Sequence, residues 1–557
     1  MTNFQFPRSE TTLLHGGQQV DPATNARAVP IYQTTSYVFN NTEHAQNLFA
    51  LAEMGNIYSR IMNPTVDAFE QRIALLEDGV AAVGTASGAS AITLAILNLA
   101  NAGDEIIADS NLYGGTFNLF NKTLPKYGID VKFVDGTDPE NFRSAITEKT
   151  KAIYGEVITN PSLNVLDLEV IADIAHENGI PLIIDNTFAT PYVCKPISWG
   201  RRYCRTLCNK MDWWHGTSIG GVVVDSGRFN WNSERFPGFT EPDDSYNGIR
   251  FGIDIGPPAF AIKLRVQLLR DIGPSLSPQN AFYFLQGLET LHLRIQQHSE
   301  NTKVVANYLE NHPQVEWVSY PGLENHPSNK LAKKYFFRNL FGSIIVFGIK
   351  GGKEAGRQVI DNVKLWSHVA NVGGDAKSLI IHPASTTHQQ LNAEELKSSG
   401  VTEELIRLSV GIESADDIIA DLDQAIATAT NSEPTIKANA DQAISWALSS
   451  PLARENGEIR PKTIAVAGAI EQSEALVKLQ KLGYQVIPAD NIDGDVDILF
   501  VVDSNEAENA YSDQAKIVWF AEGQTNESVK GKAEANGQII IENKCPYQEA
   551  DRLRRGE

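Results

Sequence analysis

Three short segments carry residue types that together suit a phosphate-bearing cofactor. Residues 85–90, Thr-Ala-Ser-Gly-Ala-Ser, precede an apolar helical stretch, so the N–H groups at a helix start would bind a phosphate. Asp185 closes an apolar strand, where its carboxylate could hold a protonated heteroaromatic nitrogen. Lys210 precedes a glycine-rich stretch, and a lysine desolvated beside a cofactor can form a Schiff base. Taken singly, each segment also has an ordinary explanation: a structural turn, a helix cap or salt bridge, and a solvated lysine.

A mostly parallel sheet would bring these residues together. The patterning predicts strands over residues 152–157 and 181–184, with a helix over 168–178 between them. Residues 105–108 and 131–134 have the same strand character. Repeated strand–helix–strand units predict an α/β fold in which ligands bind at the carboxyl ends of the strands.

Composition and charge restrict the kind of protein. The chain has 557 residues, of which 42% are hydrophobic and 21% charged, as in globular proteins of several domains. Its 47 Lys and Arg against 68 Asp and Glu give a net charge of -21, which argues against nucleic-acid or membrane-surface partners. Four cysteines are too few for a disulfide scaffold, and the N-terminal residues lack a signal-peptide pattern. A cytoplasmic protein is therefore expected.

The uncharged stretch 80–103 is long enough to suggest a membrane span. It is interrupted by glycine, serine, threonine and asparagine, which favours a loop and a buried helix instead.

The chain also carries a set of motifs that resembles one enzyme family. From about residue 11 to about residue 430 it resembles the Cys/Met-metabolism family of pyridoxal-phosphate enzymes, and within it the O-acetylhomoserine sulfhydrylases. The matching segments are residues 58–60 (Tyr-Ser-Arg), 63–65, 87–88, 112–116, 160–161, 185–191 (Asp-Asn-Thr-Phe-Ala-Thr-Pro), 286–290, 382–388 and 407–413 (Arg-Leu-Ser-Val-Gly-Ile-Glu). The resemblance implies a fold-type I transferase with pyridoxal 5'-phosphate (PLP) as its cofactor, and no metal.

The resemblance also assigns cofactor-binding roles to individual residues. Gly88 and Ala89 would bind the cofactor phosphate through their N–H groups, and Tyr113 would stack on the ring. Asp185 would pair with the ring nitrogen, and Lys210 would carry the cofactor and move protons. The candidate catalytic residues are Lys210, Tyr113 and Tyr58.

Other assigned residues concern the substrate and a second subunit. Asn160, Ser378 and Arg407 would bind the substrate, with Asn160 and Arg407 holding its carboxylate. Tyr58 and Arg60 would reach the cofactor phosphate of a neighbouring subunit, so the resemblance implies active sites shared within dimers and a homotetramer. The implied reaction converts O-acetylhomoserine and sulfide to homocysteine and acetate. Cystathionine synthase, methionine γ-lyase and O-acetylserine sulfhydrylase activities remain alternatives.

Residues 201–214 depart from the family pattern. They read Arg-Arg-Tyr-Cys-Arg-Thr-Leu-Cys-Asn-Lys-Met-Asp-Trp-Trp, where the family has an apolar strand ending in Ser-x-Thr-Lys. Back-translation with a one-base shift gives Ala-Asp-Ile-Val-Val-His-Ser-Ala-Thr-Lys-Trp-Ile-Gly-Gly, which is the family sequence. We therefore expect a base inserted near Gly200 and one lost before His215.

Two other readings of this segment remain. If the printed residues are real, three arginines enter a strand beside the cofactor, and the chain is a catalytically impaired paralogue with a regulatory or structural role. A metal site of Cys204, Cys208 and His215 is disfavoured, because no fourth ligand lies at a suitable spacing.

The predicted domain organisation has four parts. Residues 1–270 form the arm and large cofactor-binding domain, 271–430 the small part of the catalytic unit, 431–461 a linker, and 462–557 an appended Rossmann-like domain. Residues 278–309 are predicted as one long helical region. The appended domain resembles small CoA-binding domains, but its first loop (residues 468–473) has a single glycine and an acidic residue where a phosphate would lie. A structural or regulatory module is favoured over a nucleotide-binding one.

Overall fold

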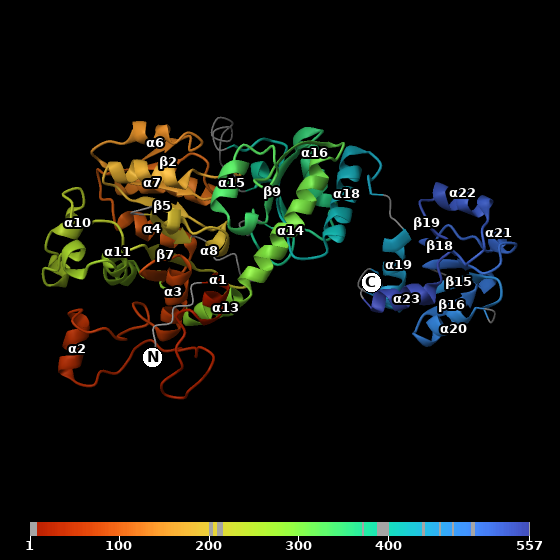
Figure 1. Ribbon diagram of the computed structural model, residues 1–557, viewed down its shortest axis with the longest axis horizontal. Helices are drawn as coiled ribbons and strands as arrows, with labels where there is room; N and C mark the ends of the chain where they lie inside the picture. Colours follow the sequence, from red (N-terminus) through yellow and green to blue (C-terminus); the bar gives the residue numbers. More distant parts are fainter. Residues whose placement is uncertain are drawn as a thin grey trace. The chain divides into compact units, whose positions relative to one another are not determined.

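The computed structural model of the protein describes residues 8–199, 204–208, 216–369, 373–386, 400–436, 440–455, 458–470, 473–491 and 496–555. It divides into two compact units, Met1–Glu433 (unit 1) and Pro434–Glu557 (unit 2). The two units are drawn in Figure 1 and are described separately below.

Unit 1 is built on a seven-stranded sheet of order β1-β7-β6-β5-β4-β2-β3. The strands are β1 (Ala81–Thr85), β7 (Gly221–Asp225), β6 (Cys204–Cys208), β5 (Leu182–Asp185), β4 (Thr150–Glu156), β2 (Glu105–Asp109) and β3 (Asp130–Val134). Strand β7 runs antiparallel to both β1 and β6, and the other neighbours are parallel. The predicted mostly parallel sheet is confirmed. The carboxyl ends of β1, β6, β5, β4 and β2 therefore meet at one edge.

Helices precede, connect and follow these strands along the chain. They are α1 (Ser9–His15), α2 (Thr42–Phe49), α3 (Pro64–Leu76), α4 (Gly88–Leu97), α5 (Gly114–Asn118), α6 (Glu140–Ala145), α7 (Leu168–Glu177), α8 (Thr190–Val193), α9 (Pro196–Trp199), α10 (Pro237–Thr240), α11 (Ala259–Lys263) and α12 (Arg270–Ile272). The π-helices η1 (Leu119–Thr123), η4 (Phe251–Ile255) and η5 (Leu264–Leu269) and the 3-10 helices η2 (Leu124–Tyr127) and η3 (Asp244–Tyr246) complete this part.

The uncharged stretch 80–103 forms β1 and α4. Ala91, Ile92, Leu94 and Ile96 on α4 are at most 1% exposed, so the helix packs against the sheet as predicted. Among the described residues no helix is both long enough and apolar enough to cross a membrane.

A second sheet in unit 1 has the order β10-β11-β12-β9-β8. Its strands are β8 (Val315–Ser319), β9 (Ile344–Ile349), β10 (Ser367–His368), β11 (Leu379–Ile381) and β12 (Leu405–Ser409). Its helices are α13 (Pro278–Glu289), α14 (Leu291–Glu310), α15 (Asn329–Tyr335), α16 (Gly352–Asn362) and α18 (Ala415–Thr430), with η6 (Phe337–Asn339) and η7 (Pro383–Ser385). Helix α14 packs against β8, β9 and α18 (Figure 1).

The helical region predicted over residues 278–309 is two helices. Thr290, with φ -110° and ψ 8°, leaves the helical conformation and ends α13. Its hydroxyl accepts a hydrogen bond from Arg294 Nε at 3.3 Å, which joins the start of α14 to this break. Threonine competes locally with the helix in this way because its hydroxyl bonds to neighbouring groups.

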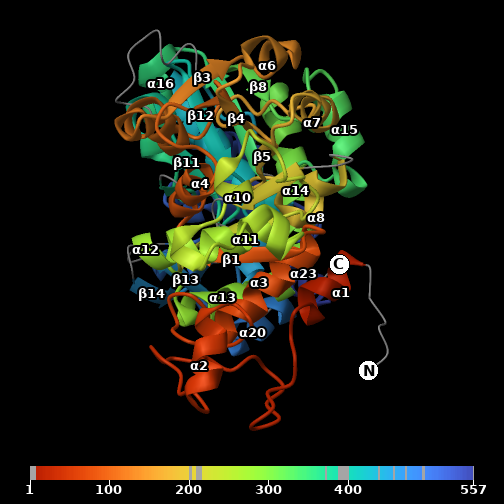
Figure 2. The same ribbon diagram turned by 90° about the vertical axis from the view of Figure 1, so that its left-hand side faces the viewer.

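Residues 18–62, called the arm, lead from α1 to α3. Both views place α2, on this segment, away from the seven-stranded sheet (Figures 1 and 2). Its apolar side chains include Val38, Phe49 and Met54, which are 96%, 62% and 72% exposed. Asn63 ends the arm and caps α3 by accepting a hydrogen bond from Thr65 N at 3.0 Å.

Unit 2 contains a parallel five-stranded sheet of order β16-β15-β17-β18-β19. The elements are β15 (Thr463–Ala467), α20 (Glu474–Lys481), β16 (Gln485–Pro488), η9 (Ala489–Asn491), β17 (Ile498–Val501), α21 (Ala507–Ala510), β18 (Ile517–Phe520), α22 (Glu527–Ala535), β19 (Ile539–Ile541) and α23 (Pro546–Arg554). Buried residues face both sides of this sheet, in two apolar clusters. The alternating strands and helices place it in the α/β class.

Residues 431–461, predicted as a linker, are largely structured. They contain α19 (Ala440–Ser449) and the hairpin of β13 (Leu452–Glu455) with β14 (Glu458–Pro461). Ala443, Ile444 and Ala447 of α19 are at most 3% exposed and belong to an apolar cluster of unit 2. Polarity and Pro434 suggested a linker, but the apolar face of α19 is what packs on the sheet.

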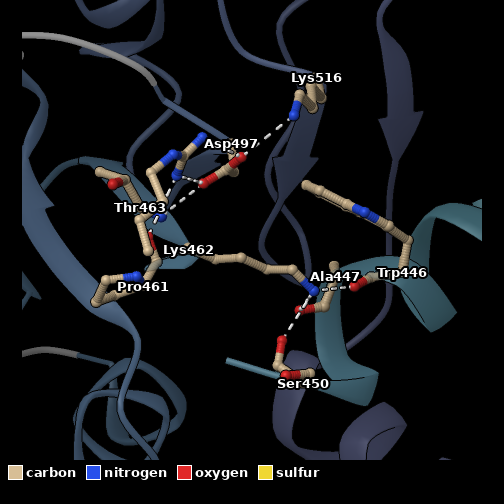
Figure 3. Close-up of polar contacts among 9 residues, drawn as sticks. Trp446, Ala447, Ser450, Pro461, Lys462, Thr463, Asp497 and Lys516 are labelled. Atoms are coloured by element: carbon tan, nitrogen blue, oxygen red, sulfur yellow. Dashed lines mark hydrogen bonds and ion pairs between the residues drawn. The ribbon is translucent and has the colours of Figure 1, made fainter. Parts of the chain in front are cut away.

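A buried lysine joins α19 to this sheet (Figure 3). Lys462, 2% exposed, donates to the main-chain oxygens of Trp446, Ala447 (3.5 Å) and Ser450 (2.8 Å). These carbonyls belong to the end of α19, where a helix leaves its acceptors without partners. Burial lowers the pKa of Lys462, and the ring of Trp446 lies 4.5 Å from its ammonium group.

Replacing this lysine should loosen α19. Lys462→Met removes the donor to three carbonyl groups, which should destabilise unit 2 by about 2 kcal/mol. We expect faster hydrogen exchange in peptides covering residues 440–461, measured by mass spectrometry on the full chain. Lys516→Met is the control, because Lys516 contacts the same Trp446 ring but is 45% exposed. Equal exchange in the two variants would show that Lys462 does not hold α19.

Candidate active site

The carboxyl edge of the seven-stranded sheet gathers most of the predicted site residues. Asp185 is the last residue of β5, Glu156 is its register partner at the end of β4, and Tyr113 follows β2. The loop before α4 follows β1 at the same edge. Ligands of parallel α/β sheets bind at this edge.

Asp185 is a buried carboxylate, 5% exposed, that hydrogen bonds fix in place. One oxygen accepts from Thr187, from its N–H at 2.9 Å and its hydroxyl at 2.5 Å. The other accepts from the Tyr154 hydroxyl at 3.3 Å. Donors to a carboxylate favour its charged form, so the residue suits pairing with a protonated ring nitrogen.

The turn before α4 has the geometry of an anion site. The Ser87 hydroxyl accepts from Ser90 N at 3.2 Å and so caps the helix. Gly88 and Ala89 follow at the first helical positions, whose N–H groups have no partner within a helix. No acceptor is recorded for either N–H group among the described residues. These two donors and the helix dipole suit a phosphate, as the sequence predicts.

Two buried carboxylates hold the segment that ends at Tyr113. Asp109 accepts from Asn111 N at 3.0 Å and from Gly136 N at 3.3 Å. Glu156 accepts from Tyr113 N at 2.8 Å. Tyr113, half-buried, is therefore fixed through its backbone next to Glu156.

The buried Asp109 should make stability depend on pH. Burial raises its pKa to about 7. The folded chain therefore keeps this proton between about pH 4 and pH 7, where the unfolded chain has lost it, so stability falls as the pH rises through this range. Over this pH range the free energy of unfolding should fall by on the order of 4 kcal/mol less in the Asp109→Asn protein than in the unchanged protein. Urea unfolding of both proteins across this pH range measures the difference. Parallel curves of the free energy of unfolding against pH would refute the prediction.

Asn160 and Arg407 meet across the two sheets of unit 1. Arg407 on β12 donates from Nη1 to Asn160 Oδ1 at 3.3 Å, and the two residues are 6% and 4% exposed. Asn160 follows β4 near the carboxyl edge. An arginine fork beside an amide suits a carboxylate ligand, which is the role predicted for this pair.

Ser378 is fully buried, with its hydroxyl bonded inside the protein. It donates to Glu413 Oε2 at 3.0 Å and accepts from Gly411 N at 2.9 Å. These bonds tie the start of β11 to the chain after β12. The substrate-binding role predicted for Ser378 stays a prediction, and the contacts of this hydroxyl are structural.

Tyr58 and Arg60 lie on the arm. Tyr58 is 38% exposed, and the Arg60 guanidinium carbon lies 5.1 Å from the centre of its ring. Exposure of both residues suits contact with another subunit, as predicted.

Lys210 lies outside the described residues, as do most of residues 201–214 and His215. The backbone of β6 is described. Leu207 is the register partner of Asp185, and β6 ends at Cys208, two residues before Lys210 in the chain. Of the metal site considered for Cys204, Cys208 and His215, only the backbone of the two cysteines is described, and the described part of the chain contains no cluster of metal ligands.

Several residues of the site were missed by sequence reasoning. Tyr154, Glu156 and Thr187 contact predicted site residues. Thr187 lies in the matching segment 185–191 but was given no role there, whereas Tyr154 and Glu156 belong to no motif that signals a ligand. Glu156 had one signal, since a charged residue closes β4 after the uncharged run of residues 152–155.

Comparisons with known proteins agree with this geometry. Residues 10–427 match the sequence model of the Cys/Met metabolism PLP-dependent enzyme family. The chain is 53% identical over 430 residues to an O-acetyl-L-homoserine sulfhydrylase of Leptospira meyeri, covering 75% of this chain and 96% of the relative. It is 54% identical over 423 residues to a homocysteine synthase of Schizosaccharomyces pombe, covering 75% and 98%.

A solved structure points the same way. A Campylobacter jejuni chain, metY, that carries N'-pyridoxyl-lysine-5'-monophosphate matches with a TM-score of 0.72 and 42% identity, over 75% of this chain and 99% of that one. Unit 2 begins beyond the last residue of the family match.

Proposed function

Because the chain belongs to the Cys/Met metabolism family of PLP-dependent enzymes, we propose that it converts O-acetyl-L-homoserine and sulfide to L-homocysteine and acetate. The observation that carries this proposal is the arrangement around Asp185. A fixed carboxylate, two free helix-start N–H groups and an arginine–asparagine pair belong to one unit. Relatives named for this reaction match over the same residues.

The residues would divide the work as follows. Gly88 and Ala89 would bind the phosphate of PLP, and Asp185 would hold a proton on its ring nitrogen. Bound PLP accepts electron density from the substrate Cα. Lys210 would carry the cofactor and then take and return the proton at that atom. Tyr113 would stack on the ring.

Substrate binding is assigned to a pair of residues, one from each sheet of unit 1. Arg407 and Asn160 would hold the substrate carboxylate, which leaves the amino group and Cα directed towards the cofactor. The acetate leaves from Cγ, and sulfide takes its place there.

Two subunits would share each active site. Tyr58 and Arg60 lie on the exposed arm, and we assign them to the cofactor phosphate of a neighbour. Exposed Val38, Phe49 and Met54 on the arm give it an apolar surface suited to a second copy. We propose a homotetramer built of such dimers, active in the cytoplasm. Sedimentation at assay concentrations tests the state, and an active monomer would contradict it.

Unit 2 resembles small CoA-binding domains, but we assign it a structural or regulatory role. Asp490, Asp503, Glu522 and Glu542 follow four of its strands at the carboxyl edge, where acidic groups would repel phosphates. Calorimetry of the full chain with CoA tests this assignment. Binding that saturates at one site per chain would reverse it.

An assay of thiol formation tests the main proposal. O-acetylhomoserine with sulfide should give homocysteine faster than O-acetylserine with sulfide gives cysteine, and faster than O-acetylhomoserine with cysteine gives cystathionine. Inactivity with every donor would favour an impaired paralogue, which the printed residues 201–214 make a specific second candidate.

A further inference from the structure

An arginine at the base of the arm makes an unusually complete set of contacts. Arg265, on η5, donates from Nη1 to the Ile61 carbonyl at 2.7 Å and from Nη2 to the Ala82 carbonyl at 2.9 Å. Nη2 also pairs with Glu70 Oε2 at 2.5 Å. One guanidinium group therefore joins the arm, β1 and α3.

Glu70 extends this connection towards the phosphate turn. Its other carboxylate oxygen accepts from Gly84 N at 2.6 Å, in β1. The side chain of Glu70 is 5% exposed and that of Arg265 is 16% exposed, so the pair is largely shielded from water. Strand β1 ends at Thr85, directly before Ser87 and Gly88.

Packing alone does not fix the arm above this pair. A cavity of about 340 Å³ lies beside it, lined by Leu48, Met54 and Ile57 of the arm and by Ala74, Ile262 and Val266 of α3 and the segment 259–269. Apolar side chains that face a cavity lack contacts on that side. The hydrogen bond from Arg265 to the Ile61 carbonyl therefore contributes more to fixing the position of the arm than it would if side chains filled this cavity.

The other fixed point of this segment lies close by in the chain. Asn63 Nδ2 donates to Ser59 Oγ at 3.0 Å and to the Tyr32 carbonyl at 2.8 Å. Tyr58 and Arg60 thus lie just before two anchors, Ile61 held by Arg265 and Asn63 held in the arm.

We propose that Arg265 is a positioning residue that sets the segment carrying Tyr58 and Arg60 for use by the neighbouring subunit. Through Ala82 and Glu70 the same side chain links this segment to the phosphate turn of its own subunit. The inference rests on the proposed function, in which Tyr58 and Arg60 complete the neighbour's site. It adds a physical connection between the two sites of a dimer, made by one residue that touches neither cofactor.

Hybrid enzymes test this role. One chain keeps Lys210, and a second, differently tagged chain with Lys210→Ala is coexpressed in large excess, so that each live site is completed by the arm of an inactive chain. Arg265→Lys is then placed on either chain. Lysine keeps the charge beside Glu70 but cannot reach both carbonyl groups. The PLP dissociation constant of the live site and the KM for O-acetylhomoserine are measured.

The expected result depends on placement. Arg265→Lys on the inactive chain should weaken PLP binding at the live site about tenfold or more. On the live chain it should change binding less than about twofold, because lysine keeps the charge beside Glu70, which still accepts from Gly84 N in that chain's β1, and the displaced arm serves the dead site. Equal effects in the two placements, or no effect in either, would overturn the inference.

Two further variants separate the possible failures. Tyr58→Phe, placed in the same two ways, tests the shared site itself. If it shows no dependence on placement, the shared site is wrong and the inference falls with it. If the effect of Tyr58→Phe depends on placement and the effect of Arg265→Lys does not, the shared site stands and only the inference about Arg265 is wrong. Glu70→Gln keeps the acceptor for Gly84 N but breaks the ion pair with Arg265. It replaces Arg265→Lys if the Arg265→Lys chain fails to assemble. It should weaken PLP binding at the live site when it is placed on the inactive chain.

Discussion

Restoring the alternative reading frame over residues 201–214 is expected to raise PLP affinity by about 100-fold or more. Of the three arginines in the printed residues, Arg205 belongs to β6, which lies between β5 and β7 inside the seven-stranded sheet. A strand with neighbours on both sides is normally apolar, and each unpaired buried charge there costs several kcal/mol. The alternative frame replaces the three arginines by alanine, aspartate and valine, so that valine stands at position 205 within β6, and it places serine and threonine hydroxyls before the same lysine.

The two chains can be compared directly. Both are expressed with all other residues unchanged, PLP is titrated, and an absorbance band near ~420 nm reports the cofactor bound to lysine. Lys210→Ala in the restored chain is the matched control and should abolish the band. Similar affinity and activity in the two chains would show that the printed segment is functional. Resequencing the gene here tests the origin of the difference.

Asp185→Asn is expected to lower kcat by on the order of 10²–10³-fold. The amide keeps the size of the carboxylate, and its one oxygen can still accept from Thr187, while its NH2 group can donate to the Tyr154 hydroxyl oxygen. It cannot hold a positive charge on a ring nitrogen, so the cofactor would accept less electron density from Cα. The loss should fall on kcat more than on KM, because Arg407 and Asn160 bind the substrate elsewhere.

Asp173→Asn is the control for this variant. Asp173 is exposed on α7 and should leave kcat within about twofold. Steady-state assays with O-acetylhomoserine and sulfide measure both. An Asp185→Asn enzyme with unchanged kcat would remove Asp185 from the cofactor site.

Periodicity and end signals were enough to predict much of unit 1. The apolar runs that became β2, β4 and β5 are short and bounded, and α7 begins at a capping Asp167 and ends before Gly179. Such local signals do not depend on distant residues. The break at Thr290 was missed because both sides have good helical patterns, and α19 because its polar face dominated the composition of residues 431–461.

The partners of the site residues needed the structure. Arg407 and Asn160 are 247 positions apart in the chain, and Arg265 reaches Ile61 across 204. No local pattern predicts contacts of this range. Asp185 and the turn at Gly88 were predictable because each sits at the end of its own strand, whereas Tyr154 and Glu156 look like ordinary strand residues until β4 is placed beside β5.

The most direct test of the account is to locate the lysine that carries PLP. The natural gene product is reduced with borohydride, which makes the link to lysine permanent, and its peptides are sequenced by mass spectrometry. We predict one pyridoxyl group, on Lys210. The sequence of the peptide that carries it includes the neighbouring residues and therefore shows which reading frame is translated. A reduced protein without a pyridoxyl group, or with it on another lysine, would contradict the account.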